Sequence, residues 1–236
     1  MMKTDLKDFL LSGRFLSLMG KRKYFSIEDV RCVLSSQYSS LKEMTLRRYL
    51  VELMKQGSVY GAGRGWYSTV AHPFEADRLA IQGIIVLIEK KYPLLTFSCW
   101  STEQLKTHMH HMLSKFVTFI FTDKDSMAGV YDFLKDKGYD VWLNPRGKEA
   151  ERFALGKKTV VIRPGISREP VDGHIARMEK ILVDLLVESR QLKLMDTEEY
   201  YRLRSNVLES GRVDIATLLS YAKRRKLRVE NGSFMA

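Results

Sequence analysis

The chain has 236 residues, of which 45% are hydrophobic and 11% aromatic, so its composition is that of a globular protein and not of a disordered one. Its two cysteines, Cys32 and Cys99, are too few for a disulfide framework and fit a reducing compartment. No apolar run approaches the roughly 20 residues of a membrane-spanning helix, and the N-terminal sequence lacks the features of a signal peptide. We therefore expect a cytoplasmic protein without a membrane partner.

Positive charge is concentrated near the N-terminus. The net charge is +11, and residues 1–72 hold 12 Lys and Arg against 6 Asp and Glu, whereas residues 73–236 hold 27 against 22. A net charge of +6 over less than a third of the chain is expected where a protein meets a polyanion such as DNA. A generally basic protein would show a similar total, and charge alone does not separate the two interpretations.

The N-terminal part of the chain predicts three helices and a hairpin. The first helix begins after Thr4, and Ser26 with Asp29 three residues later resembles a capping box that starts the second helix. The third helix runs from about Leu41 to Gln56 and ends at Gly57. Two β-prone triplets, SVY and WYS, then flank the segment GAGRG, which predicts a tight hairpin.

The third helix has one apolar face and one polar face. Leu46, Leu50 and Leu53 form the apolar stripe, and Arg48 lies on the opposite side. A surface ion pair between Arg48 and Glu52 would explain the polar face without DNA. However, three helices followed by a hairpin is the order of a winged helix-turn-helix, whose third helix enters the major groove while the wing follows the phosphates. The side chains that we expect to contact DNA are Lys42, Thr45, Arg47, Arg48, Lys55 and Arg64.

From Pro73 onwards short apolar runs alternate with amphipathic segments. After a helix at about Glu75–Lys91, strands are expected at LLTFSCW, KFVTFIFTD, YDVWLNP and KKTVVIRPG, and helices at TEQLKTHMHHML and DSMAGVYDFLKDKG. This alternation is typical of an α/β domain with a mixed or parallel sheet. The segments MEKILVDLLVES, EEYYRLRSNVLES and VDIATLLSYAKRRK predict a helical C-terminal tail. The predicted fold is α+β or α/β, with a winged helix-turn-helix at 1–72 and a larger α/β domain with a helical tail at 73–236.

Residues suited to catalysis or metal binding are sparse. His108 and His111 lie three residues apart on an expected helix, but no second cluster of ligands accompanies them, so we interpret them as surface histidines. Cys99 lies in an apolar strand and is expected to be a small core residue. Asp140 lies on an expected strand, but KEAERF lacks the lysine of the Asp…Glu-x-Lys pattern of metal-dependent nucleases. The glycine-rich GAGRG leads into a strand and not into a phosphate-binding helix. We predict no catalytic residue, no metal site and no cofactor.

Two charged segments of the tail are candidates for contact with a protein partner. In MEKILVDLL the charged residues lie beside an apolar face, and a core helix with solvated charges is favoured over a partner-binding face. In SYAKRRKLR several cations end a helix, where they suit the helix dipole but could equally meet an acidic partner or DNA. The candidate partner-binding residues are Glu179, Lys180, Asp184, Arg224 and Arg225.

Six short motifs follow one another along nearly the whole chain: RGWYS, TFSCWST, WLNP, VVIRPGISREPV, MEKILVDLL and LLSYAKRRK. Their order and spacing resemble the AbiEi-like antitoxins of type IV (abortive infection) toxin–antitoxin systems. The resemblance implies a winged helix that binds the operon's own promoter, as double-stranded DNA, and represses transcription. It also implies a C-terminal domain that counteracts a nucleotidyltransferase-like toxin, and it assigns no catalytic role to any residue.

Two other functions stay open at this point. One is a nucleic-acid-processing, nuclease-like enzyme that uses the winged helix as a targeting domain. The other is a transcriptional regulator whose second domain binds a small ligand. A nucleotidyltransferase-like protein encoded by the adjacent gene would favour the antitoxin over both.

Overall fold

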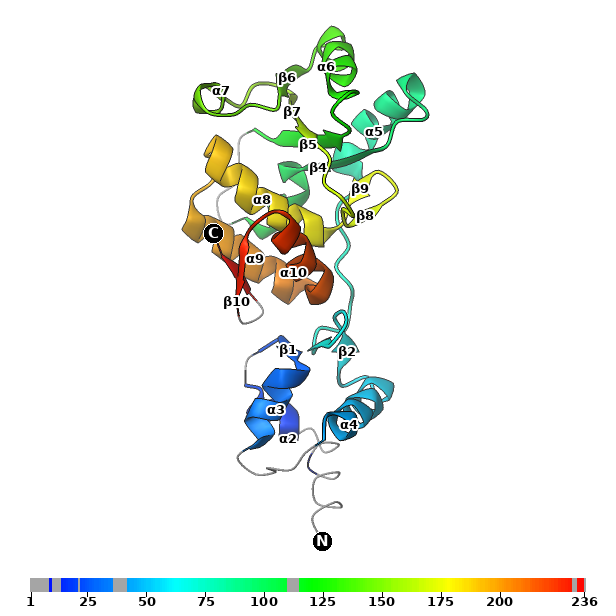
Figure 1. The fold of residues 1–236 in the computed structure, drawn as a ribbon, viewed down its shortest axis with the longest axis vertical. Helices are drawn as coiled ribbons and strands as arrows, with labels where there is room; N and C mark the ends of the chain where they lie inside the picture. Colours follow the sequence, from blue (N-terminus) through cyan, green and yellow to red (C-terminus); the bar gives the residue numbers. More distant parts are fainter. Residues whose placement is uncertain are drawn as a thin grey trace. The chain divides into compact units, whose positions relative to one another are not determined.

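The computed structural model describes residues 9, 14–20, 22–35, 42–109, 115–230 and 233–235. The chain divides into two compact units, both drawn in Figure 1. Unit 1 comprises Met1–Phe74 and Leu208–Leu219, and unit 2 comprises Glu75–Val207 and Ser220–Ala236. Within the described residues, no helix combines the length and the apolar character that crossing a membrane requires.

Unit 1 combines short helices with a small antiparallel sheet. Its helices include α2 (Arg14–Leu18), α3 (Ile27–Ser35) and α4 (Glu43–Lys55). The strands β1 (Tyr24–Ser26), β2 (Tyr60–Gly61) and β3 (Trp66–Ser68) form an antiparallel sheet in the order β1-β3-β2. The expected start of the first helix after Thr4 lies outside the described residues.

Local signals in the sequence set the start of α3 and the end of α4. The Ser26 N–H donates to Asp29 Oδ2 (2.7 Å) and the Asp29 N–H donates to Ser26 Oγ (3.1 Å), which confirms the predicted capping box with Asp in place of Glu. Gly57 follows α4 with a φ of +69°, in the left-handed region that favours glycine. The predicted stripe Leu46, Leu50 and Leu53 is buried in the core of unit 1, where it joins residues of β1 and α3.

A segment from a distant part of the sequence completes unit 1. The Tyr24 hydroxyl donates to the Gly211 carbonyl (2.9 Å) and accepts from the Val213 N–H (3.0 Å). The Ile215 N–H donates to the Ala62 carbonyl at the hairpin (2.8 Å). The sequence predicts that Gly211, Val213 and Ile215 belong to the helical tail of the second domain. Unit 1 is therefore discontinuous in sequence, because Leu208–Leu219 packs with the N-terminal elements.

Unit 2 is built on a mixed six-stranded sheet in the order β6-β7-β5-β4-β9-β8. Strands β5, β6 and β7 are parallel, β4 runs antiparallel to β5 and parallel to β9, and β8 is antiparallel to β9. The mixed α/β class is thus confirmed, and the short strands β8 and β9 add to the four predicted strands. The strands are β4 (Phe97–Ser101), β5 (Val117–Thr122), β6 (Asp140–Leu143), β7 (Thr159–Pro164), β8 (Val171–Asp172) and β9 (Ile175–Ala176).

The helices predicted after Pro73 are present with one change of type, whereas α7 and the strands β10 and β11 were not predicted. The segment at residues 102–113 was expected to be α-helical, but Thr102–His108 forms a 3-10 helix, η1, and residues 110–114 lie outside the described residues. The side chains of Thr102 and Gln104 accept hydrogen bonds from backbone N–H groups of β5 and β4, which competes with an α-helix. The other described elements are α5 (Leu79–Lys91), α6 (Met127–Asp136), α7 (Lys148–Glu151), α8 (Met178–Leu192), α9 (Thr197–Ser210), α10 (Ile215–Arg224), β10 (Arg228–Glu230) and β11 (Ser233–Met235).

Helices cover both faces of the sheet of unit 2 (Figure 1). On one face, Ile120 and Val160 join an apolar core with α5 and α6. On the other face, Phe121 lies under α8, with Lys180 Nζ 3.4 Å from the centre of its ring. Because successive side chains of a strand point to opposite faces, β5 and β7 supply both layers. The result is that α8 is buried along most of its length.

Candidate functional site

The outer face of α4 presents Arg48 to solvent. Arg48 lies opposite the buried leucines and forms no hydrogen bond or ion pair with any described residue. The alternative ion pair with Glu52 is not present, because Glu52 Oε1 lies 3.2 Å from the Nζ of Lys55. Met44 and Val51, which are 79% and 46% exposed, lie on the same face as Arg48. A cation between apolar side chains suits the base edges and thymine methyl groups of a major groove.

Arg47 differs from Arg48 because a carboxylate holds it. Its Nε and Nη2 donate to Glu43 Oε1 at 2.9 and 2.6 Å, and Arg31 Nη2 donates to the other oxygen at 2.9 Å. The hydrogen bonds from Arg47 and Arg31 hold the pKa of Glu43 below its ordinary value. Arg47 therefore carries a partly neutralised charge, and contact with a phosphate would have to compete with Glu43.

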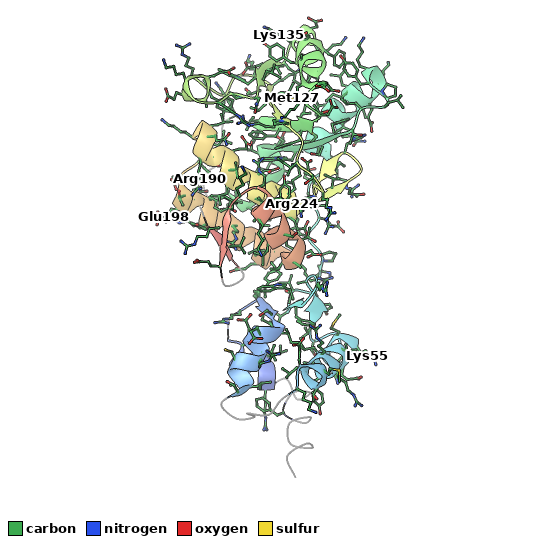
Figure 2. All side chains as sticks on the ribbon, viewed as in Figure 1. Lys55, Met127, Lys135, Arg190, Glu198 and Arg224 are labelled. Carbon is green, nitrogen blue, oxygen red and sulfur yellow. The ribbon has the colours of Figure 1, made fainter. Side chains whose placement is uncertain are left out.

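The remaining predicted DNA contacts lie at the ends and flank of α4. Lys42 is exposed directly before the helix, and Thr45 is half-buried in its first turn. Lys55 is exposed in the last turn, and Figure 2 shows it at the surface of unit 1. The structure thus exposes a cation at each end of α4, with Arg48 between them.

The hairpin between β2 and β3 carries Arg64 at its turn. The Ala62 N–H donates to the Trp66 carbonyl (2.9 Å) and the Trp66 N–H to the Gly63 carbonyl (3.0 Å), which confirms a tight connection. Gly63 and Gly65 have φ values of +100° and +77°, which favour glycine on both sides of Arg64. Arg64 is exposed and forms no ion pair with the residues that the structure describes.

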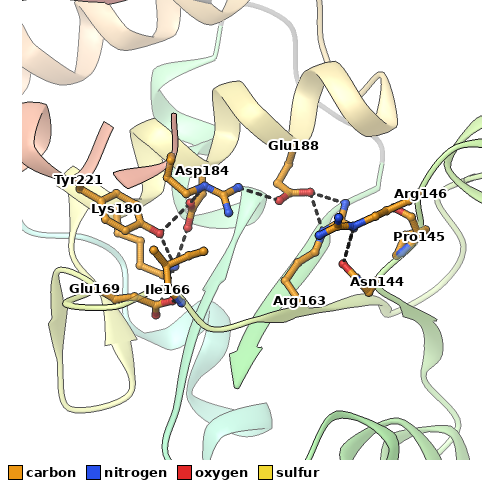
Figure 3. A network of polar contacts seen from close by, with 11 residues as sticks. Asn144, Pro145, Arg146, Arg163, Ile166, Glu169, Lys180, Asp184, Glu188 and Tyr221 are labelled. Carbon is orange, nitrogen blue, oxygen red and sulfur yellow. Dashed lines mark hydrogen bonds and ion pairs between the residues drawn. The ribbon is translucent and has the colours of Figure 1, made fainter. Parts of the chain in front are cut away.

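Unit 2 contains a buried network of charged side chains between α8 and the sheet (Figure 3). Lys180 Nζ lies 2.6 Å from Asp184 Oδ2, 3.0 Å from the Tyr221 hydroxyl and 3.4 Å from Glu169 Oε2. The Tyr221 hydroxyl donates to Asp184 Oδ1 (2.9 Å). The Glu169 carboxylate is held in turn by the Ile166 N–H, which donates to its Oε1 (2.6 Å).

Two arginines extend this network along α8. Arg225 lies 3.0 Å from Asp184 Oδ1 through Nε and 3.2 Å from Glu188 Oε1 through Nη2. Arg163 of β7 donates from Nε and Nη2 to Glu188 Oε2 at 3.0 and 2.6 Å, and from Nη1 to the Pro145 carbonyl at 2.8 Å. Glu188 therefore accepts hydrogen bonds from both arginines, and Figure 3 shows it beside Arg163.

The charges of the network balance. Its cations are Lys180, Arg163 and Arg225, and its carboxylates are Glu169, Asp184 and Glu188. Burial opposes the charge of Arg225, but Asp184, Tyr221 and Glu188 more than offset this, so the pKa of Arg225 is raised. Burial and the charge of Asp184 raise the pKa of Tyr221 well above its ordinary value. The phenol therefore stays protonated and can donate to Asp184.

The candidate partner-binding residues lie mostly inside unit 2. Lys180 and Asp184 have no exposed side-chain surface, so neither can touch a partner while unit 2 keeps this structure. Glu179 is also buried, and Arg225 is 11% exposed. Arg224 is half-buried, with Nη2 donating to the Arg168 carbonyl (2.9 Å). The core-helix interpretation is right about α8, but its charges are paired with each other and not solvated.

The sequence did not reveal the remaining charged members of the network, which are Arg163, Glu169 and Glu188. One signal was available, because Arg163 interrupts the apolar strand TVVIRP, and a buried cation needs a carboxylate nearby. The sequence alone does not identify the carboxylate that pairs with Arg163, since Glu188 is 25 residues away in sequence.

Two of the side chains considered for catalysis, Asp140 and Cys99, are held within the fold. Asp140 Oδ2 accepts from Thr159 Oγ1 (2.9 Å), so the carboxylate ties β6 to β7. Burial raises the pKa of the Cys99 thiol far above its ordinary value, and the charge of Lys180 opposes this only in part. Burial lowers the pKa of His108, and His111 lies outside the described residues. The described parts of the chain contain no cluster of His, Cys, Asp or Glu suited to a metal ion.

The fold defines a mixed α/β protein of two units. The chain belongs to DUF6577, a family of unknown function whose profile matches residues 45–236. The match begins within α4 and continues through the hairpin and unit 2. A comparison with curated proteins gives no match. The solved structure of the RV2827C protein from Mycobacterium tuberculosis is 14% identical over 93% of this chain and 83% of that chain, with a TM-score of 0.25.

Proposed function

We propose that the protein is a DNA-binding antitoxin of a type IV toxin–antitoxin system. Unit 1 binds double-stranded DNA at the promoter of its own operon and represses it, and unit 2 counteracts a nucleotidyltransferase-like toxin. The observation that supports DNA binding is Arg48 on the exposed face of α4, unpaired among the described residues, followed by a hairpin with Arg64 at its turn. The antitoxin half rests on the resemblance of six sequence motifs to AbiEi-like antitoxins.

The arrangement of unit 1 supports a winged helix-turn-helix. The element order α2-β1-α3-α4-β2-β3 and the sheet order β1-β3-β2 match those of a winged helix, with α4 as the recognition helix and the β2–β3 hairpin as the wing. In such a complex α4 lies in the major groove, where Arg48 reads a base edge. Lys42, Lys55 and Arg64 then lie where phosphates flank the groove.

A nuclease-like enzyme is a weaker candidate. Such an enzyme would need Asp140 as a metal ligand, but Asp140 Oδ2 is engaged by Thr159 Oγ1 (2.9 Å) and by Trp142 Nε1 (3.4 Å). A methyl group on Gly156 would lie only 2.7 Å from the same oxygen, so the carboxylate is closely packed against the neighbouring loop. These contacts explain Asp140 as part of the fold.

Salt dependence tests the DNA-binding half. If α4 and the hairpin neutralise about four phosphates, the logarithm of the affinity should fall with the logarithm of salt concentration with a slope of roughly −3.6. The measurement is a fluorescence-anisotropy titration of the full-length protein on the DNA upstream of its gene. Binding that does not change with salt would contradict the electrostatic account.

A growth assay tests the antitoxin half. The full-length protein, co-expressed with a nucleotidyltransferase-like protein from the adjacent gene, should relieve the growth arrest that this protein causes. The double variant Arg48→Ala/Arg64→Ala should also relieve the arrest when both genes are transcribed from foreign promoters, because protection is assigned to unit 2. Magnesium- or manganese-dependent cleavage of DNA or RNA by the purified protein, lost in Asp140→Asn, would favour the nuclease instead.

A further inference from the structure

A cavity of about 420 Å³ lies in unit 2 where α8 ends and α9 begins. Its lining comes from residues 186–200. Pockets that hold small molecules have volumes of about 300–1,000 Å³, so the cavity has room for one small ligand. Leu186 and Met195 contribute apolar side chains to the lining, and Tyr200 contributes an aromatic one. The cavity therefore offers an apolar surface to part of a ligand.

Ser189 of α8 lines this cavity with a hydroxyl group that has no hydrogen-bond partner. The residue is 6% exposed, and its Oγ forms no hydrogen bond with any described residue. Buried hydroxyl groups nearly always have a partner, because an unsatisfied polar group in a protein interior is costly. A ligand in the cavity would supply the partner that Ser189 lacks.

Two cations near the end of α8, Arg190 and Lys193, also line the cavity. Both are exposed, and neither forms an ion pair or a hydrogen bond with the residues that the structure describes. Lys193 has a φ of +52°, a left-handed conformation that is strained for a residue other than glycine. The dipole of α8 explains cations at this end of the helix without a ligand, but it does not explain the unpartnered hydroxyl of Ser189.

The first turn of α9 adds backbone donors beside the same cavity. Asp196 and Thr197, where α9 begins, both line it. Asp196 Oδ1 accepts from the Glu199 N–H (2.7 Å), whereas the N–H groups of Thr197 and Glu198 donate to no described residue. The first N–H groups of a helix have no intrahelical acceptor, and together with the helix dipole they favour a phosphate group.

The carboxylate of Asp196 narrows the class of ligand. Its Oδ2 accepts from no described residue, so it is available to a donor in the cavity. A carboxylate repels a bare phosphate ion, but it accepts hydrogen bonds from the hydroxyl groups of a ribose. The lining thus combines groups for a phosphate, a sugar hydroxyl and an apolar ring, which are the three parts of a nucleotide.

We propose that this cavity binds a nucleoside monophosphate, either free or at the 5′ end of a nucleic-acid strand. Arg190, Lys193 and the first N–H groups of α9 hold the phosphate, whose charge of about −1.5 to −2 at pH 7 the two cations balance. The Ser189 hydroxyl donates to the phosphate, Asp196 accepts from the ribose, and the base packs against the apolar side chains. The site is independent of the proposed antitoxin function, because none of these residues belongs to the proposed DNA contacts.

Calorimetric titration of the full-length protein with AMP, GMP, CMP and UMP tests the site. At least one of them should bind, and Arg190→Ala/Lys193→Ala should weaken that binding at least about tenfold, because two charge-assisted contacts are lost. The control Lys124→Ala/Lys135→Ala removes two exposed lysines outside the lining, of which Lys135 is labelled in Figure 2, and should bind like the wild type. Wild-type affinity in Arg190→Ala/Lys193→Ala would overturn the site.

Ser189→Ala separates contact with a ligand from a role in the fold. Because the hydroxyl has no partner among the described residues, its loss should leave the Tm of the free protein unchanged or raise it, yet weaken nucleotide binding about tenfold. Ser101→Ala is the opposite control, since Ser101 Oγ donates to the Val117 carbonyl (3.2 Å) and accepts from the Glu103 N–H (3.2 Å). It should lower the Tm and keep the wild-type affinity. A lower Tm with unchanged affinity in Ser189→Ala would contradict the proposal.

Three further ligands define the occupant. Inorganic phosphate that binds as tightly as the best monophosphate would mean that the cavity takes phosphate alone, and the nucleoside part of the proposal is wrong. A 5′-phosphorylated RNA tetranucleotide and the same strand without its phosphate distinguish the two sources. Tighter binding of the phosphorylated strand than of the free monophosphate identifies a strand end, and weaker binding identifies the free nucleotide. If none of these nucleotides binds at millimolar concentration, the site does not exist.

Discussion

Lys180 and Asp184 lie one turn apart on α8 and form an ion pair of 2.6 Å in which neither side chain is exposed to solvent (Figure 3). Removing a charged group from water costs several kcal/mol even in a real protein interior. Here the Tyr221 hydroxyl, the Glu169 carboxylate and the ring of Phe121 also contact Lys180, so the cost is offset by several partners at once. Each charge depends on the others for compensation.

The first prediction concerns the loss of one partner. Lys180→Met should lower the free energy of unfolding of unit 2 by about 3–5 kcal/mol, because Asp184 is left buried with one cation fewer. Urea denaturation followed by the fluorescence of the tryptophans of unit 2 measures this loss. Lys55→Met removes an exposed pair with Glu52 and should cost at most about 1 kcal/mol. Equal small losses in both variants would mean that the network contributes nothing to stability.

The second prediction is a fall in stability at high pH. Burial, followed by the charge of Asp184, raises the pKa of Tyr221 above its ordinary value of 10.0. The folded protein therefore keeps a proton that the unfolded chain loses above pH 10.0, so this stabilisation is fully present below that pH and is lost as the pH rises.

Urea midpoints measured between roughly pH 8 and pH 11 show this effect. Tyr221→Phe should be less stable at the lower pH, because Lys180 and Asp184 each lose a hydrogen-bond partner, and its midpoint should fall less steeply with pH. Tyr201→Phe changes an exposed phenol and should keep the wild-type dependence. A Tyr221→Phe curve parallel to that of the wild type would contradict the raised pKa.

The sequence predicts most elements of the fold because their signals are local. The Ser26–Asp29 cap, the leucine stripe of α4 and the alternating apolar strands all depend on residues a few positions apart. The class of sheet also follows from the order of strands and helices. These features require no knowledge of which distant segments meet.

The sequence does not predict features that depend on distant contacts. Arg163 and Glu188 meet across 25 residues, and Tyr24 and Gly211 across 187. A charged residue on a helix is most often solvated, so Lys180 and Asp184 were interpreted as surface charges at the edge of an apolar face. Only the packing of α8 against β5 and β7 shows that this edge is covered. The same limitation hides the return of Leu208–Leu219 to unit 1.

The third prediction separates the two arginines of the proposed DNA interface. Arg48 lies on the outer face of α4, so Arg48→Ala should relax sequence preference at one base pair and cost about 1–3 kcal/mol there. Arg64 lies at the turn of the hairpin, where phosphate contact is expected, so Arg64→Ala should weaken binding to all sequences by a similar amount. Anisotropy titrations on the promoter and on a scrambled duplex measure both effects. Equal losses on both duplexes from Arg48→Ala would place α4 outside the groove.

The last prediction tests whether the distant segment holds unit 1 together. A methyl group on Gly211 would lie 2.7 Å from Phe74 Cα and 3.0 Å from its Cβ, closer than side chains approach a backbone. Gly211→Ala should therefore displace Leu208–Leu219 and destabilise unit 1 by about 1–3 kcal/mol. Promoter affinity should fall too, because the hydrogen bond from Ile215 to Ala62 supports the hairpin that carries Arg64.

Gly129→Ala is the matched control for this substitution. Gly129 lies inside α6, and its added methyl group would meet only the Tyr92 hydroxyl at 3.6 Å, an ordinary contact. This variant should be stabilised by about 0.5–1 kcal/mol, because alanine loses less backbone freedom in a helix than glycine does. Thermal unfolding and promoter anisotropy are measured on both variants. If Gly211→Ala unfolds and binds DNA like the wild type, the hairpin does not depend on the returning segment, and residues 1–74 form the DNA-binding unit alone.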